Sequence, residues 1–353
     1  MQKAFGTGAA TNSIEDLDAT DAIFLFGANP TEAHPVTGSK IKQLFMKGVT
    51  SIVVDPVKTT LAKLATYHLQ LRPGTNVAIL NMMGHYILKE GLIKKEFIDK
   101  YTEFYNEFKE HVSGLDMDEL EKLTGVSKEL VKKAAIAYAS ANNAMEFHGL
   151  GVTEHYQGSK TVMLLSNLAM MTGNVGRKGV GLNPLRGQNN VQGAADMGVQ
   201  PHQGAGYLNI NDPEIQKYYA KKYGVPKMPE YEGLKIPEMI NAAIEGKFKA
   251  LWIMGEDTLM TDPNSNHIRK AFEKLDLLVV QELFMSATAE MADVVLPAAS
   301  YFEKNGTFTN GERRVQRVNK VIEPIGNCKP DGQIIIDMMY KLGYEQPTGR
   351  TYD

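Results

Sequence analysis

The sequence contains a single cysteine, Cys328, among its 353 residues. One cysteine excludes an internal disulfide, and it excludes a metal or iron–sulfur site made only of cysteines from this chain. No apolar run reaches membrane-spanning length, and the first residues, MQKAFGTGAATNS, lack the apolar core of a signal peptide. The net charge of −3 gives no reason to expect non-specific binding to nucleic acid or to acidic membranes. We therefore expect a protein of the reducing cytoplasm.

The chain also lacks the glycine fingerprint of common nicotinamide-binding domains, G-x-G-x-x-G. The first apolar run ends in FGANPT, which has one glycine, and GRKGVG (176–181) follows an expected helix and is interpreted as a connection. The eight histidines form no H-x-x-x-H pair. His34, His148 and His155 lie near expected strand ends, where a lone histidine is more often a hydrogen-bonded rim residue than a ligand.

Apolar runs alternate with segments of helical spacing along most of the chain. The expected strands cover residues 22–29, 51–56 and 144–151, then 249–257, 276–282 and 292–300; the expected helices cover 36–47, 76–91, 127–141 and 160–174, then 236–246 and 265–275. Such alternation predicts mostly parallel, doubly wound sheets. The polar run 181–204 interrupts it, and KKYGVPKMPEYEGLK (221–235) is expected to be a solvated loop.

The predicted fold class is α/β, with two doubly wound (Rossmann-like) parallel-sheet domains and a short β-rich segment near the C-terminus. Residues 1–187 are expected to form the first α/β domain and residues 188–300 the second. Asn-Gly turn signals between short alternating runs predict that 301–329 are β-rich and part of a third domain, and 330–353 are expected to return to the second.

Polar residues follow four of the expected strands, in FGANPTEAHP, VDPVK, GLGVTEHYQG and MGEDTLMTD. Open α/β sheets bind ligands at the carboxyl ends of their strands. There Gly27 would let the backbone approach a phosphate, Asn29 and Glu32 could reach a ribose or base, and Asp55 could accept from ribose hydroxyls or from the N1 and N2 edge of guanine. Each residue alone is more typical of an ordinary turn, but the four segments together favour a large nucleotide ligand.

One short run, GLNPLRGQNNVQGAADMG (181–198), concentrates amide side chains around a single arginine, Arg186. The amides are Asn183, Gln188, Asn189, Asn190 and Gln192. A guanidinium holds a carboxylate through a planar fork and stays charged at any working pH. The common fate of an arginine is a salt bridge, yet the nearest acid in the run is Asp196. Because buried amides need partners, the run predicts a polar, heteroatom-rich ligand beside a carboxylate-binding arginine.

These segments closely resemble the catalytic (alpha) subunit of molybdenum- or tungsten-dependent formate dehydrogenases, a family that binds bis-molybdopterin guanine dinucleotide. The resemblance covers nearly the whole chain. It is carried by NPLRGQNNVQGAADMG, MTGNVGRKGVGL and GLGVTEHYQG, and it continues through AATNSIEDLDATDAIFLFGANPTEAHP, VVDP, LRPGTNVAILN, GEDTLMTD and MADVVLPAASYFEKNGTFTNGERRVQRV.

The resemblance implies roles for individual residues. Arg186 matches the arginine that orients formate, and Gly187 and Gln188 match positions near one pterin. Positions along one guanine dinucleotide are matched by Asn29, Glu32, Val54, Asp55, Gly74, Asn76, Leu150 and Glu154, and positions along the other by Asp257, Thr261 and Gln281. The neighbouring Gly27, Gly151, Asn190 and Gly255 complete the expected cofactor-binding set. Glu154 stands where the pattern usually has glutamine, and Val57 where it often has arginine.

The resemblance also implies the reaction, reversible oxidation of formate to CO2 at a molybdenum or tungsten bis-pterin centre. Electrons would pass to an iron–sulfur cluster outside this chain, and then to electron-transfer subunits of iron–sulfur, flavin or hydrogenase type. The family's cysteine or selenocysteine metal ligand, its N-terminal 4Fe–4S domain and its C-terminal β-barrel have no counterpart here. We therefore expect an inactive fragment without a metal ligand. One hypothesis for its start is a selenocysteine UGA codon misread as a stop.

Two other functions are consistent with parts of this pattern. One is another molybdopterin oxidoreductase, acting on nitrate or a similar oxyanion. The other is a non-catalytic structural relative in an electron-transfer complex. The unbroken NPLRGQNNVQG run argues against both, because the first class does not share it in full and the second should have lost it. A nicotinamide-dependent dehydrogenase is disfavoured by the missing glycine fingerprint.

Overall fold

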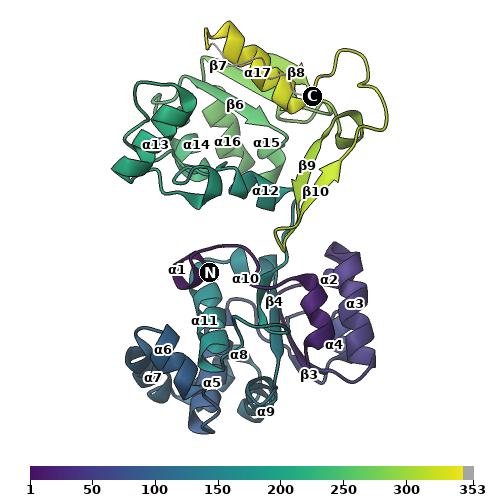
Figure 1. Ribbon diagram of the computed structural model, residues 1–353, viewed down its shortest axis with the longest axis vertical. Coiled ribbons are helices and arrows are strands. Elements are labelled where there is room, and N and C mark those ends of the chain that lie inside the picture. Colours follow the sequence, from purple (N-terminus) through teal and green to yellow (C-terminus); the bar gives the residue numbers. More distant parts are fainter. Residues whose placement is uncertain (345–353) are drawn as a thin grey trace. The chain divides into compact units, whose positions relative to one another are not determined.

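The computed structural model describes residues 1–344, which form two compact units (Figure 1). Unit 1 contains residues 1–193 and 309–314. Unit 2 contains residues 194–308 and the described residues from 315 onward, so the backbone passes between the units three times. Residues 330–353 were predicted to return to the second domain, and the last nine of them, 345–353, lie outside the described residues.

Unit 1 is built on a five-stranded sheet in the order β3-β2-β1-β4-β5, with every neighbouring pair parallel. The strands are β1 (Ala22–Phe26), β2 (Thr50–Val54), β3 (Tyr67–Leu69), β4 (Ala144–His148) and β5 (Gly181–Pro184). The strand order reverses between β1 and β4, which is the switch point where a doubly wound sheet binds its ligand. The expected strands at 22–29, 51–56 and 144–151 are confirmed, each somewhat shorter than predicted.

The composition of the polar run 181–204 suggested that it lies outside the sheet, but part of it is a strand of the sheet. Its first residues form the edge strand β5, in which Leu182 is fully buried in the core and Asn183 donates from Nδ2 to the Glu146 carbonyl at 3.2 Å. Burial of one leucine and pairing with β4 outweigh the polar composition of the segment.

The helices of unit 1 connect these strands and cover the sheet. They are α1 (Gln2–Phe5), η1 (Ile14–Ala19), α2 (Pro30–Ala33), α3 (Pro35–Met46), α4 (Thr60–Leu64), α5 (Asn76–Lys89), α6 (Lys95–Tyr101), α7 (Tyr105–Ser113), α8 (Met117–Thr124), α9 (Lys128–Ala139), α10 (Leu150–Thr153), α11 (Gly158–Met171) and α12 (Val191–Asp196), the last of which crosses the boundary between the units. The expected cap at Ser127 is present, because its hydroxyl accepts from Leu130 N and satisfies a free N–H of the first turn of α9.

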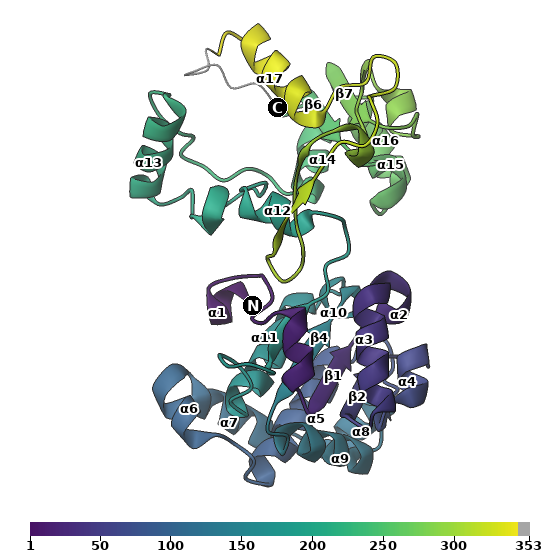
Figure 2. The same cartoon turned by 45° about the vertical axis from the view of Figure 1, so that its right-hand side comes forward.

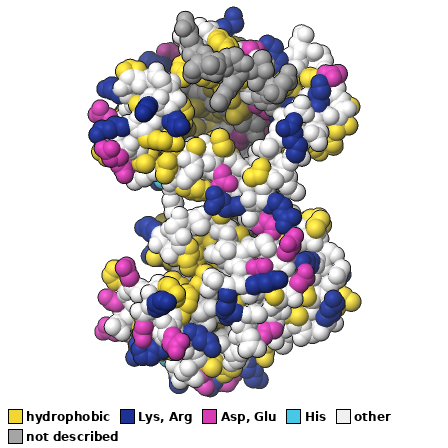
Figure 3. Space-filling model, in the orientation of Figure 1, with side chains coloured by type: hydrophobic (Ala, Val, Ile, Leu, Met, Phe, Trp, Pro, Cys, Tyr) yellow, Lys and Arg dark blue, Asp and Glu magenta, His cyan; other side chains and the backbone are white. Residues whose placement is uncertain are grey.

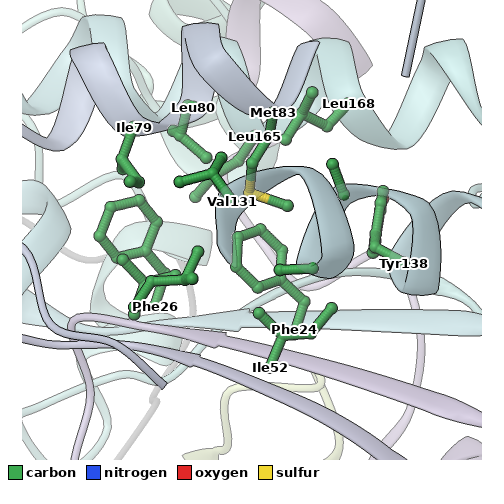
Figure 4. Packing of buried hydrophobic residues seen from close by; sticks show 14 of the residues in the cluster. Phe24, Phe26, Ile52, Ile79, Leu80, Met83, Val131, Tyr138, Leu165 and Leu168 are labelled. Carbon is green, nitrogen blue, oxygen red and sulfur yellow. The ribbon is translucent and has the colours of Figure 1, made fainter. Parts of the chain in front are cut away.

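Alternate side chains of β1 enter two cores, one on each face of the sheet. Phe24 and Phe26 pack against α5, α9 and α11 (Figure 4), whereas Ile23 and Leu25 pack on the other face with Ile41 of α3. Figures 1 and 2 show α3 and α4 on one side of the sheet and α5, α9 and α11 on the other. A strand buried on both faces must be apolar throughout, which is why the AIFLF run predicted it. The doubly wound α/β class is confirmed.

Unit 2 has a smaller parallel sheet in the order β6-β7-β8. Its elements are η2 (Ala205–Tyr207), α13 (Pro213–Tyr223), α14 (Ile236–Ile244), β6 (Ala250–Met254), α15 (Thr258–Thr261), α16 (Ser265–Phe272), β7 (Leu277–Glu282), η3 (Ala289–Met291), β8 (Val294–Pro297), η4 (Tyr301–Glu303) and α17 (Asp331–Lys341). Its core lies between the sheet and α14 and α16, where Ile253 and Val280 meet Ile240 and Ile268.

Two further segments of the chain test the sequence predictions. The expected loop 221–235 is wrong at its start, because α13 continues to Tyr223 before Gly224 ends it in the left-handed conformation. In the expected β-rich segment, β9 (Gly306–Thr309) pairs with β10 (Val315–Val318), and the turn between them carries Asn310 and Gly311.

Among the described residues, no helix combines the length and the apolar character needed to cross a membrane. On the face seen in Figure 3, Lys and Arg side chains are interspersed with Asp and Glu over both units. Charged side chains of one sign therefore form no large patch on that face.

Candidate functional site

A cleft of about 360 Å³ opens at the carboxyl edge of the unit 1 sheet, and its walls come from the segments after β1, β2 and β4. Six predicted cofactor-binding residues line it, namely Gly27, Asn29, Val54, Asp55, Asn76 and Gly151. The volume is typical of small-molecule sites, and the place is the switch point between β1 and β4. The structure thus brings together residues that are up to 124 positions apart in the sequence, from Gly27 to Gly151.

The base of the cleft is a close contact between two glycines. Gly27 has φ +56°, and its carbonyl accepts from Gly151 N at 3.0 Å. A Cβ on Gly27 would lie 2.7 Å from the Gly151 carbonyl carbon, closer than carbon atoms can approach. Gly27 was expected to give room for a phosphate. The structure shows a further reason for the glycine, which is the contact between the β1 and β4 turns.

Asp55 and Asn76 supply polar groups on the walls of the cleft. Asp55 Oδ1 accepts from Val57 N at 2.8 Å, while Oδ2 has no hydrogen-bond partner among the described residues. Partial burial raises the pKa of this carboxyl group, against the opposing effects of the Val57 N–H and of His68. Asn76 donates from Nδ2 to the Gly151 carbonyl at 3.0 Å. One carboxylate oxygen is therefore available to a ligand N–H or O–H.

The structure does not place every predicted residue of unit 1 in this cleft. Outside its lining lie Glu32 in α2, Gly74 before α5, Leu150 in α10 and Glu154 after α10. Of the three histidines expected near strand ends, His155 lines the cleft.

Arg186 follows β5 and is fixed by three other segments of unit 1. Its Nε and Nη2 both donate to Gln192 Oε1, at 3.1 and 2.8 Å, and Nη2 also donates to the Gly8 carbonyl at 3.0 Å. The Arg186 carbonyl accepts from His34 Nε2. Within the described residues, no acid lies within ion-pair distance of the guanidinium and Nη1 has no hydrogen-bond partner.

The amides after Arg186 have different environments. Gly187 and Gln188 are exposed, whereas Asn190, with φ +60°, accepts from Thr309 N through Oδ1 at 2.9 Å. This bond connects the polar run to the turn between β9 and β10. Among the predicted cofactor-binding residues of this run, Asn190 therefore already has one structural contact, whereas Gly187 and Gln188, the two predicted to lie near a pterin, remain open to a ligand.

Two ionisable residues of β4, Glu146 and His148, are buried and have shifted pKa values. Burial lowers the pKa of His148 to about 4, assisted by the amino terminus and by Arg186, and both of its ring nitrogens lack partners among the described residues. Burial raises the pKa of Glu146 to about 8, and Tyr138 donates a hydrogen bond to Glu146 Oε1. In the apolar run AMEFHGLG, Glu146 and His148 are two polar residues spaced two positions apart, as on one face of a strand. That spacing does not reveal how deeply they are buried, so the pKa shifts could not be predicted.

The predicted residues of unit 2 lie at the carboxyl ends of β6 and β7. Gly255 N donates to the Gln281 carbonyl at 2.9 Å. Gln281 is fully buried, its Nε2 donates to Asp331 Oδ1 at 2.7 Å, and its Oε1 has no partner among the described residues. Asp257 Oδ1 accepts from the backbone and hydroxyl of Thr288, whereas Thr261 is exposed. Gln281 is thus the member of this set with an unsatisfied buried acceptor.

No group of three or more His, Cys, Asp or Glu residues in residues 1–344 is arranged to hold a metal ion.

The pattern of the family described as molybdopterin oxidoreductase matches residues 3–340. The chain belongs to this family. It is 42% identical over 353 residues to formate dehydrogenase H of Escherichia coli (strain K12), with all of this chain and 49% of that protein aligned. It is 46% identical over 345 residues to the F420-dependent formate dehydrogenase subunit alpha of Methanocaldococcus jannaschii, covering 98% of this chain and 50% of that protein. The predicted resemblance is confirmed, and the chain spans about half the length of these relatives.

A solved structure supports the fold assignment. Acetylene hydratase from Pelobacter acetylenicus superposes with a TM-score of 0.76 at 22% identity, over 96% of this chain and 49% of that one. The two proteins therefore share this fold.

Proposed function

We propose that this chain is the cofactor-cradling and substrate-positioning part of an enzyme that oxidises formate reversibly to CO2. The observation that carries the proposal is the state of Arg186, a cation that is held by neutral acceptors, has no acidic partner among the described residues and keeps Nη1 open. Such a group binds a small carboxylate without first having to break an ion pair. The relatives that are named formate dehydrogenases support the choice of carboxylate.

The residues present fit a bis-molybdopterin guanine dinucleotide cofactor. The cleft of unit 1 offers the open Asp55 oxygen and the glycine-lined β1 and β4 turns, and unit 2 offers the buried, unsatisfied Gln281 Oε1. In the proposal, residues of the first cleft hold one guanine dinucleotide, while Gly255, Asp257, Thr261 and Gln281 hold the other, and Gly187 and Gln188 approach a pterin. When bound with molybdenum or tungsten, this group supplies the two-electron redox chemistry.

The chain's own contribution is to bind and orient the substrate. Arg186 would hold the formate carboxylate so that its C–H is directed to the redox centre, which is catalysis by positioning. The oxidation releases two electrons and one proton. We further propose that the electrons leave through a 4Fe–4S cluster outside residues 1–353 to electron-transfer subunits, in a cytoplasmic enzyme. On this proposal the chain by itself is inactive, since it holds the cofactor site without a metal ligand.

Replacing Arg186 with Lys in the cofactor-loaded, full-length enzyme tests the proposal. A lysine cannot reproduce this arrangement, because its three N–H donors share one nitrogen, whereas Arg186 contacts Gln192 and Gly8 through Nε and Nη2 and keeps Nη1 for formate. Loss of charge-assisted hydrogen bonds worth about 1.5–3 kcal/mol should lower kcat/KM by roughly 10- to 150-fold, with a higher formate KM.

Formate-dependent dye reduction measures both parameters. Arg269→Lys, at an exposed position of α16 in unit 2, is the matched control and should keep wild-type kinetics. Unchanged kinetics in the Arg186→Lys enzyme would remove Arg186 from the reaction.

A further inference from the structure

We infer that Gln192 is the positioning residue of Arg186, and that it holds the guanidinium with a neutral acceptor so that the positive charge remains available to the anionic substrate. This inference deepens the proposed function and rests on it. Gln192 lies in α12, and only 1% of its surface is exposed. A side chain buried to that degree on a helix has little rotational freedom, so its Oε1 is a fixed reference point for the guanidinium.

The hydrogen bonds define which edge of the guanidinium is used. Gln192 Oε1 accepts from both Nε and Nη2 and so occupies the side edge of the fork, and the Gly8 carbonyl accepts from the same Nη2. The donors that remain without a partner in the described residues belong to Nη1. Gln192 therefore determines the direction in which Arg186 presents its free N–H groups.

The chemistry of the acceptor is as important as its place. A glutamate of the same size would accept the same two hydrogen bonds, but its carboxylate would neutralise the guanidinium as an ion pair. A buried carboxylate at this position would also repel a second carboxylate. An amide oxygen holds the cation and leaves its charge uncompensated, which favours binding of formate. This explains why an amide, rather than an acid, stands in contact with the only cation of the 181–198 run.

Two substitutions separate this role from a purely structural one. Gln192→Glu preserves the size and the acceptor, whereas Gln192→Leu removes the acceptor. If Gln192 only supported the fold, the leucine variant would be the more damaged. If it positions Arg186 without neutralising it, the formate KM should rise several-fold in Gln192→Leu and at least tenfold in Gln192→Glu. In Gln192→Glu, kcat should change less than KM. Gln43→Glu, exposed on α3 of the same unit, adds the same charge as a matched control and should leave KM unchanged.

A second measurement does not depend on activity. In the 353-residue chain labelled with 15N-arginine, the Arg186 Nε–H signal can be assigned by its loss in Arg186→Lys. In Gln192→Leu, we expect this proton to exchange with water at least tenfold faster than in the wild type, because its acceptor is gone. Gln192→Glu should instead keep the proton protected.

The two measurements distinguish failure of the inference from failure of the proposed function. An unchanged exchange rate in Gln192→Leu, or a formate KM that is higher in Gln192→Leu than in Gln192→Glu, would overturn the positioning role. A third outcome is faster exchange in Gln192→Leu with wild-type formate kinetics in both Gln192 variants and in Arg186→Lys. It would confirm the hydrogen bond between Arg186 and Gln192 in the wild type but overturn the role of Arg186 in formate binding. Faster exchange together with the predicted KM order supports both.

Discussion

At the scale of single residues, β4 buries two ionisable side chains whose pKa values move in opposite directions. Glu146 and His148 are two positions apart, so they project from the same face of the strand. Burial favours the uncharged form of each, raising the pKa of Glu146 from 4.5 to about 8 and lowering that of His148 from 6.5 to about 4. The folded chain therefore holds both groups neutral over a range of pH in which the unfolded chain ionises one or both.

Glu146 should make the chain less stable as the pH rises from 5 to 8. Because its folded pKa is raised, the folded state keeps the proton while the unfolded state loses it above pH 4.5. The stabilisation is complete below the unfolded pKa and is lost as the pH rises through the folded pKa, at roughly 1.4 kcal/mol for each unit between the two values. Urea unfolding of the wild type and of Glu146→Gln measures this, and the variant should lose much less stability over the same interval.

His148 supplies an internal comparison for that experiment. Its lowered pKa costs stability in both proteins as the pH falls below 6.5, whereas Glu146 is protonated in the folded and the unfolded chain below pH 4.5. The two profiles should therefore be parallel below pH 4.5 and diverge above it. If the two proteins have parallel profiles between pH 5 and 8, Glu146 is ionised in the folded chain and the prediction is wrong.

At the scale of elements, the turns after β1 and β4 are fixed to each other by glycine. Gly27→Ala places a Cβ 2.7 Å from the Gly151 backbone at φ +56°. The left-handed backbone alone costs an alanine about 1–2 kcal/mol, and the clash requires one of the turns to move. We expect a loss of more than about 2 kcal/mol in the free energy of unfolding.

Gly48→Ala is the matched control for the Gly27 experiment. Gly48 is also in unit 1 and has φ +87°, but a Cβ there would meet no atom within 4 Å. It should show the backbone cost without the clash. Equal destabilisation of the two variants in urea unfolding would show that the contact between the turns is unimportant.

The elements also show where sequence patterns suffice and where they do not. The strands β1, β2 and β4 were predictable because burial on both faces demands apolar runs. Two edge strands, β3 and β5, were missed because an edge strand needs less apolar surface. Each of these short strands places one leucine fully in the core, Leu69 in β3 and Leu182 in β5. Within the site, Arg186 could be singled out by its neighbours in the run, but the contact with Gly8 could not, because it joins residues 178 positions apart.

At the scale of the whole molecule, each unit has cores of its own. Those of unit 1 lie on both faces of its sheet, and that of unit 2 lies between β6, β7, α14 and α16. Within residues 1–344, each of these buried clusters is confined to a single unit. The backbone passes between the units three times, and we predict that each core is nevertheless stabilised within its own unit.

Calorimetry of the chain should accordingly resolve two unfolding transitions. Leu25→Ala removes a fully buried side chain from unit 1, and Ile268→Ala removes one that is 3% exposed from unit 2. Such truncations cost about 2–5 kcal/mol, which for units of this size corresponds to a fall in Tm of roughly 5–15 °C. Each variant should lower one transition and leave the other in place, because the lost contacts lie within a single core. A single transition that both variants lower equally would mean that the two units unfold as one cooperative body, and they could not then be treated as separately stable parts.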